Sequence, residues 1–257
     1  PAKGKTVSES LDSRWMMDLI QFNNKPVAVG RKTFRFILVA INVFDRYLYA
    51  LPLESKEPAV VLEALTKLLT VAPRKPKLIS SDDGLEFKGP VSAYLTRRDI
   101  VQKFKDTADV NGLGLIDKAI QSLKVRLAEA TTVAGKTWAS ELARLVNGFN
   151  NAPKTGVLHG APPKDVRGDH EVRFMLLQDQ AKNMQHNTAL AAKRTAAVED
   201  TGSFRAPLPE STGKFKRSYQ ATYGEPQQMA SVRGGDGHHH PRGQIRAEIC
   251  KGGPGEQ

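Results

Sequence analysis

A nearly continuous apolar run at residues 34–44 limits most strongly what this chain can fold into. The run, Phe-Arg-Phe-Ile-Leu-Val-Ala-Ile-Asn-Val-Phe, is rich in β-forming residues and lacks regular polar alternation, which is typical of a central strand buried on both faces. Residues 46–53 follow after almost no loop, so we expect the two segments to pair as a hairpin. A strand that is covered on both faces favours an α/β fold with helices on both sides of a sheet.

The rest of the pattern supplies the other strands and the helices. Pro58 is expected to open a helix, since its missing N–H costs nothing in the first turn. We expect further strands at 15–22, 77–81 and 100–104, helices at 91–95, 113–130 and 138–150, a loop at 156–168 and a polar helix at 171–197. This order predicts a mixed five-stranded sheet with helices on both faces.

Charge and composition narrow the range of partners. The 257 residues carry a formal net charge of +11, which favours a polyanionic partner because lysines and arginines release counterions when they meet phosphates. No apolar run approaches the ~18 residues of a membrane-spanning helix, so no membrane partner is expected. The single cysteine, Cys250, excludes an internal disulfide framework and fits a reducing compartment. No signal peptide opens the chain, and its start at Pro1 suggests a processed product or a fragment of a longer polyprotein.

Three aspartates stand where a metal site for phosphodiester chemistry would need them. Asp18 closes an apolar run, Asp82 follows a short strand, and Asp117 lies just beyond Ile116 at the margin of a helical apolar stripe. Attack on a phosphodiester is served by two divalent ions ~4 Å apart, held by hard oxygen ligands. In this arrangement Asp18 would bridge both ions, and Asp82 and Asp117 would flank it. For any one aspartate alone, a strand-end cap or a solvated acid is the alternative.

The contexts of these acids resemble a known family. Trp15 with Asp18, the run Ser-Asp-Asp-Gly-Leu-Glu-Phe at 81–87, and Asn111 followed by Gly112 match motifs of retroviral and long-terminal-repeat retrotransposon integrases. The segment 14–168 is therefore similar to the catalytic core of these integrases, whose fold resembles ribonuclease H. The family pattern has Glu as the third acid, whereas this chain has Asp117. Related mariner-type transposases use Asp there, with the same 34 residues between the second and third acids.

The resemblance implies an activity and its partners. It implies a polynucleotidyl transferase that joins retroelement DNA ends to target DNA with two Mg²⁺ or Mn²⁺ ions per site, bound by Asp18, Asp82 and Asp117. The partners would be double-stranded DNA, as donor ends and as target, and further copies of the chain in a homo-oligomer. The location would be the nucleus or a cytoplasmic nucleoprotein particle.

Further residues are candidates for DNA contact. Lys118 and Lys124 lie on the same predicted helix as Asp117, and integrases hold DNA with basic residues on this helix, where phosphate contacts position the duplex. An ordinary solvated helix face is the alternative. Asn111 with Gly112 resembles a loop near bound DNA, or else a plain helix cap. Asp83 is expected to point away from the site, because neighbouring residues at a strand end face opposite sides. Glu86, just past the turn, fits a turn-supporting role or a DNA contact.

After Thr201 short alternating segments are broken by Gly and Pro, which resembles the SH3-like C-terminal domain of the same integrases. This region mixes cations with aromatics, as in a nucleic-acid surface or a solvated barrel rim, at Lys214, Lys216, Arg217 and Tyr219. The expected organisation is a disordered tether at 1–13, the core at 14–168, a helical linker at 169–200, a basic SH3-like β-barrel at 201–250 and a tail at 251–257.

Two other functions remain open. A decayed or domesticated integrase relic would bind DNA without cutting it, which the aspartate at position 117 favours. A nuclease of the ribonuclease H fold would cut nucleic acid without needing a basic C-terminal barrel. Metal-dependent products of a strand-transfer assay discriminate among the three.

Overall fold

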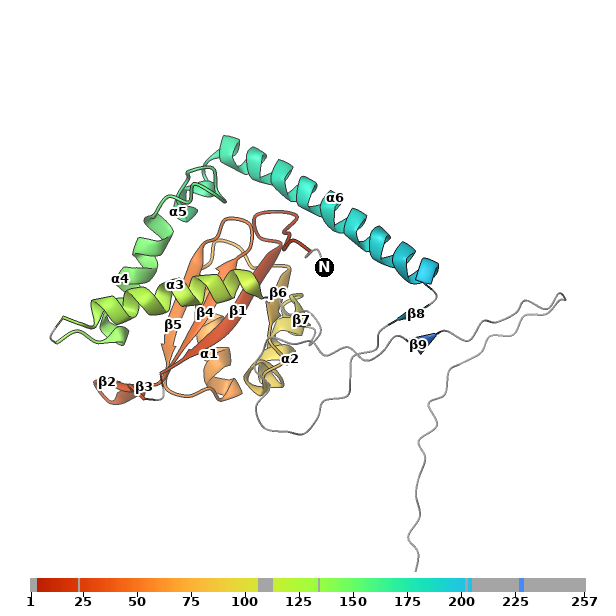
Figure 1. Ribbon diagram of the computed structural model, residues 1–257. Helices are drawn as coiled ribbons and strands as arrows, with labels where there is room; N and C mark the ends of the chain where they lie inside the picture. Colours follow the sequence, from red (N-terminus) through yellow and green to blue (C-terminus); the bar gives the residue numbers. More distant parts are fainter. Residues whose placement is uncertain are drawn as a thin grey trace, which may run out of the picture. The chain divides into compact units, whose positions relative to one another are not determined.

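The computed structural model describes residues 4–22, 24–105, 113–133, 135–201, 203–204 and 227–228. The chain divides into two compact units, Pro1–Ala197 and Val198–Gln257. The first unit contains a five-stranded sheet with the strand order β5-β4-β1-β6-β7 (Figure 1). Its strands are β1 Arg14–Gln21, β4 Phe36–Asn42, β5 Leu48–Leu53, β6 Leu78–Ser81 and β7 Val101–Phe104.

The sheet is mixed. Strand β4 runs antiparallel to both β1 and β5, which confirms the expected hairpin, whereas β6 runs parallel to β1 and to β7. The helices are α1 Pro58–Val71, α2 Pro90–Arg97, α3 Gly114–Ala130, α4 Trp138–Asn151, α5 Pro163–Val166 and α6 His170–Thr201, with a 3₁₀ turn, η1, at Leu85–Phe87. The prediction of a five-stranded α/β sheet is therefore confirmed.

The sheet separates two apolar cores, and β4 contributes to both. Ile37, Val39 and Ile41 pack toward α3 and α4, whereas Leu38 and Ala40 pack toward α1 and α2. Every residue of β4 is buried. Because successive side chains enter opposite cores, neither face of the strand is solvated, which explains the nearly continuous apolar run in the sequence. Helices therefore cover both faces of the sheet, as expected.

The expectation of a disordered tether at residues 1–13 is wrong for residues 4–13, which pack against other parts of the first unit. Ser8 is only 2% exposed, and its backbone N–H donates to Gln180 of α6. Lys5 and Asn187 exchange two hydrogen bonds through the Lys5 backbone. These contacts are polar, so hydrophobic periodicity does not reveal them in the sequence.

Two further elements were not predicted. A small hairpin, β2 Val27–Val29 with β3 Lys32–Phe34, precedes β4, and α5 forms within the stretch expected to be a loop. Helix α6 extends the predicted polar helix at both ends, and its first turns are part of a third apolar cluster through Val172 and Leu176. The helical linker therefore begins as part of the core.

In the second unit, β8 Ser203–Phe204 pairs antiparallel with β9 Gln227–Gln228. The rest of the predicted SH3-like barrel at 201–250 lies outside the described residues, as do the tail and four predicted DNA contacts, Lys214, Lys216, Arg217 and Tyr219. The barrel and these contacts stay predictions. Within the described ranges, no helix is both long and apolar enough to cross a membrane.

Asp45, in the turn after β4, gives a pH-dependent stability that can be measured. The residue is 3% exposed, and its carboxylate accepts a hydrogen bond from the Tyr47 N–H, at 2.9 Å. Burial raises its pKa to about 7, and this outweighs that hydrogen bond and the nearby charges of Arg167 and Arg46. An acid whose pKa is raised by folding destabilises the protein at high pH, and the penalty fades as pH falls through 7 toward 3.8.

We therefore expect Asp45→Asn to raise the free energy of unfolding at pH 8, by up to about 4 kcal/mol. The amide oxygen can still accept from Tyr47, so at pH 4 the two proteins should differ little. Urea unfolding at both pH values measures this difference. An equal effect of the substitution at pH 8 and pH 4 would contradict the argument.

Candidate active site

The parallel pairing of β1 with β6 brings Asp18 and Asp82 to neighbouring positions. Met16 is in register with Ser80, and each aspartate lies two residues further along its strand direction. Side chains two residues apart on a strand point to the same face of the sheet, so both aspartates lie on the face that α3 covers. The core packing agrees, because Met16 and Ile20, which flank Asp18 at this spacing, lie in the core under α3 and α4.

Electrostatics link Asp18 to the other two predicted acids. The pKa of Asp18 is raised to about 6, chiefly by burial and also by the charges of Asp82 and Asp117. The Leu19 N–H, which donates to Asp18 Oδ1 at 2.7 Å, and the charge of Lys124 lower it. Asp117, in the first turn of α3, is therefore close enough to act on Asp18 through its charge.

Asp82 has an acidic environment of its own. Burial raises its pKa, and Glu86 and Asp83 add to the shift, whereas the Gly84 N–H and Lys105 lower it. The Glu86 carboxyl group folds back so closely that a Cβ on Gly84 would lie 2.7 Å from it. Gly84 thus makes room for Glu86 inside the turn.

Asp83 is turned elsewhere. Its Oδ1 lies 2.8 Å from Lys88 Nζ, and its side chain is 60% exposed. This confirms the expectation that Asp83 points away from the site when Asp82 points into it.

The donor set fits a divalent cation chemically. Carboxylate oxygens are the ligands that Mg²⁺ and Mn²⁺ prefer, and a cation would relieve the unfavourable burial of negative charge at Asp18. Among the described residues, however, no three His, Cys, Asp or Glu side chains lie close enough together to hold one ion. Strand register brings Asp18 and Asp82 to neighbouring positions, whereas Asp117 is exposed on α3 and acts on Asp18 through its charge.

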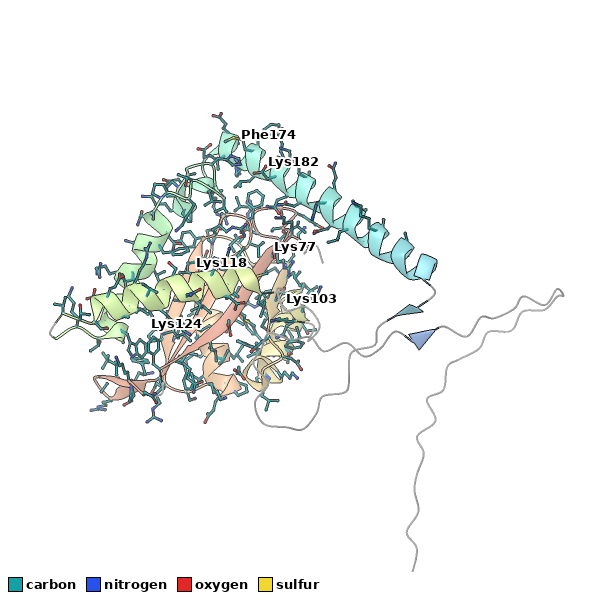
Figure 2. All side chains as sticks on the ribbon, viewed as in Figure 1. Lys77, Lys103, Lys118, Lys124, Phe174 and Lys182 are labelled. Carbon is teal, nitrogen blue, oxygen red and sulfur yellow. The ribbon has the colours of Figure 1, made fainter. Side chains whose placement is uncertain are left out.

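The two predicted lysines of α3 occupy different sides of the helix. Lys124 follows Asp117 by two turns, and its charge acts on Asp18. Lys118 is six residues before Lys124, so the two side chains leave the helix about 120° apart. Both are exposed, and Figure 2 labels both on α3. The charge of Lys124 thus reaches Asp18, whereas Lys118 leaves α3 on another side. Asn111 lies outside the described residues.

Lys105 was not predicted from the sequence as a site residue, although its charge acts on Asp82 and lowers the pKa of that carboxyl group. Lys105 follows β7 by one residue, just as Asp82 follows β6, and its N–H donates to the Ser81 carbonyl. Aligning the ends of the two predicted strands would have placed the lysine in the same row as the aspartates.

The five-stranded mixed sheet with its helices has the ribonuclease H-like fold of integrase catalytic cores. A chain of the simian T-cell lymphotropic virus intasome shares the fold, with a TM-score of 0.55 at 13% identity, over 66% of this chain and 59% of that one. The catalytic core domain of bovine immunodeficiency virus integrase matches at 19% identity with a TM-score of 0.49, over 62% of this chain and 96% of that one.

A sequence relative is more similar. An uncharacterized transposon-derived protein of Caenorhabditis elegans is 33% identical over 162 residues, which are 62% of this chain and 56% of the relative. The chain thus spans little more than half the length of that relative. No model of a known protein family matches the chain. The resemblance to integrases is confirmed at the level of the fold, and the sequence relative is transposon-derived.

Proposed function

We propose that the chain is an integrase-type polynucleotidyl transferase that joins retroelement DNA ends to target DNA. The observation that carries the proposal is the register of β1 and β6, which sets Asp18 and Asp82 side by side on the face under α3. The likeness to a transposon-derived protein and the integrase-type fold support it.

The residues of the site have separable roles in this proposal. Two Mg²⁺ or Mn²⁺ ions, when bound, would activate the attacking oxygen and stabilise the leaving oxygen of an in-line displacement. Asp18 would hold both ions, with Asp82 on one side and Asp117 on the other. Lys124 would bind a phosphate of the DNA next to the acids, and Lys118 one further along the helix surface.

The partners follow from the charge and from the resemblance. A net charge of +11 fits the binding of double-stranded DNA, both as donor ends and as target. We propose that the protein acts as a homo-oligomer, in the nucleus or in a cytoplasmic nucleoprotein particle. The SH3-like region after residue 201 would add a second DNA-binding surface.

A strand-transfer assay tests the activity. A labelled blunt duplex and a supercoiled plasmid are incubated with the full chain and either Mg²⁺ or Mn²⁺, and nicked and joined products are separated on a gel. Joined products support the integrase. Nicking without joining identifies a ribonuclease H-fold nuclease. Binding without any product identifies a relic, a function that the aspartate at position 117, in place of the glutamate of the integrase pattern, favours.

The C-terminal region gives an independent prediction. Truncation after Ala197, the end of the first compact unit, should weaken binding to a short duplex and flatten its salt dependence. Each lost phosphate contact reduces the slope of log K against log salt by ~0.9. Fluorescence anisotropy across a KCl series measures the slope. An unchanged slope would show that the first unit alone holds the DNA.

A further inference from the structure

One face of β7 carries side chains that belong to none of the apolar clusters formed by the described residues. Gln102 turns toward α2, where its amide donates to the Phe87 carbonyl and its oxygen lies 2.6 Å from the Ser92 hydroxyl. Because side chains alternate along a strand, Val101 and Lys103 point to the opposite face, the one that α3 covers elsewhere on the sheet. Val101 is 63% exposed, and Lys103 is exposed as well.

Paired residues on β1, β6 and β7 form rows across the sheet, and on this face the rows lead step by step to the carboxylate site. Lys103 is paired with Ser80, one row before the row of Asp18 and Asp82. Val101 and Arg14 belong to the row before that, both paired with Leu78. Rows on one face are two residues apart, which is about 6.6 Å along a parallel strand.

The charges of this face have one sign. Arg14 leans across β6 and donates to Ser80 Oγ at 3.3 Å, so its guanidinium group lies beside the Lys103 row. The two rows before the aspartates contain no acidic residue. At the margins lie Lys77, just before β6, and Lys118, and Figure 2 labels both together with Lys103. Within the described part of the chain, these three lysines form no salt bridge.

We propose that this face of β6 and β7, where Val101 and Lys103 are exposed beside Arg14 and the buried Ser80, binds the sugar-phosphate backbone of the nucleic-acid strand that reaches the carboxylates. Lys103 contacts a phosphate one row away from the reacting one, and Val101 contacts a sugar. The row spacing of about 6.6 Å corresponds to roughly two nucleotides of duplex rise. That the ligand is a nucleic acid rests on the function proposed above.

Lys103 has a simpler explanation that must be tested against this one. Lysines on edge strands prevent sheets from pairing edge to edge, and β7 is an edge of the sheet. A glutamate at this position would protect the edge equally well, since any charge serves. It would repel a phosphate, however. Charge reversal therefore separates the two roles.

The experiment measures binding of the full chain to a 20-base-pair duplex by fluorescence anisotropy, in EDTA, across a KCl series. The variants are Lys103→Ala, Lys103→Glu and Lys103→Arg. The matched control is Lys56→Glu, an exposed lysine in the loop after β5, at the other edge of the sheet. Thermal melting of each variant confirms that the fold is retained.

The Lys103→Ala variant should bind about eightfold more weakly in 0.1 M salt than the wild type, with a slope smaller by ~0.9, since one phosphate contact contributes this amount. Lys103→Glu should bind more weakly still, and Lys103→Arg should bind as the wild type does. Wild-type affinity and slope for Lys103→Glu, equal to those of Lys56→Glu, would overturn the proposal and leave Lys103 as an edge-protecting residue.

The same experiment with the single strand of the duplex shows which form the face holds. A loss on Lys103→Ala that is confined to the single strand, with the slope change of ~0.7 typical of single strands, would overturn the duplex geometry above. Since no metal is present, the result is independent of catalysis. If the wild type binds DNA through Lys103 but yields no strand-transfer product, the proposed transferase activity is refuted and the proposed binding surface is retained.

Discussion

Asp82→Asn is expected to reduce strand cutting and joining by at least a hundredfold while the protein stays folded. The substitution keeps the shape of the side chain but removes one of the negative charges that would hold two divalent ions at the reacting phosphate. Loss of a single electrostatic contact to a transition state already costs 10²–10³ in rate in other enzymes. Asp18→Asn should have an effect of the same size, since both acids lie in one row.

The chain supplies a matched control in the next residue. Asp83→Asn removes the same charge one position away, but Asp83 is paired with Lys88 and does not face the site. It should retain nearly all of the activity. If Asp83→Asn were inactive and Asp82→Asn active, the assignment of the two acids would be reversed.

Stability provides a readout that does not depend on activity. Burial and neighbouring charges make the ionised form of Asp18 unfavourable, so Asp18→Asn should not destabilise the metal-free protein. Millimolar Mg²⁺ or Mn²⁺ should raise the melting temperature of the wild type, because a ligand that binds only the folded state stabilises it. The Asp18→Asn variant should lose this shift.

The parts of the fold that could be predicted from the sequence have strong apolar patterns. The nearly continuous apolar run of β4 and the stripe of Ile116, Ile120, Leu123 and Leu127 on α3 indicated both the elements and their buried sides. The parts that were missed depend on polar contacts or on very short segments. Residues 4–13 are held by hydrogen bonds such as that of Ser8 with Gln180 and by the packing of Leu11 on the third apolar cluster, and α5 has only 4 residues.

The part of the candidate site that lies at strand ends could be predicted from the sequence. Asp18 and Asp82 each stand at a fixed offset in parallel neighbouring strands, so the register alone brings them together. The position of Asp117 depends instead on how far α3 lies from the sheet, which the sizes of many core side chains decide. Motif spacing identifies such a residue but does not give the distance of its carboxylate from the other acids.

The reach of Asp117 leads to the second large effect. The buried stripe of α3 anchors the helix on the sheet, so the backbone at position 117 has little freedom to approach Asp18. The Asp117 side chain is exposed, and its charge acts on Asp18 although the three acids do not assemble into one metal-binding group of described residues. A glutamate, one methylene longer, would extend the carboxylate by on the order of 1–1.5 Å from the same backbone position.

We therefore expect Asp117→Glu to raise the Mg²⁺-dependent rate of strand transfer, by up to about a hundredfold, since a misplacement of about 1 Å can cost that much. The gain should be smaller with Mn²⁺, which we expect to demand less of its ligands than Mg²⁺ does with its bond lengths near 2.0–2.1 Å. Single-turnover rates with each metal measure both effects, and Asp117→Asn separates the effect of charge from the effect of side-chain length.

If Asp117 is a ligand that is too short, the order of rates is Glu, then Asp, then Asn. A fall in rate on Asp117→Glu would instead show that α3 closes toward the sheet when metal and DNA bind, in a scaffold already adapted to aspartate. Equal rates for all three side chains would remove position 117 from the site and leave Glu86, which lies beside Asp82, as the acid to replace next.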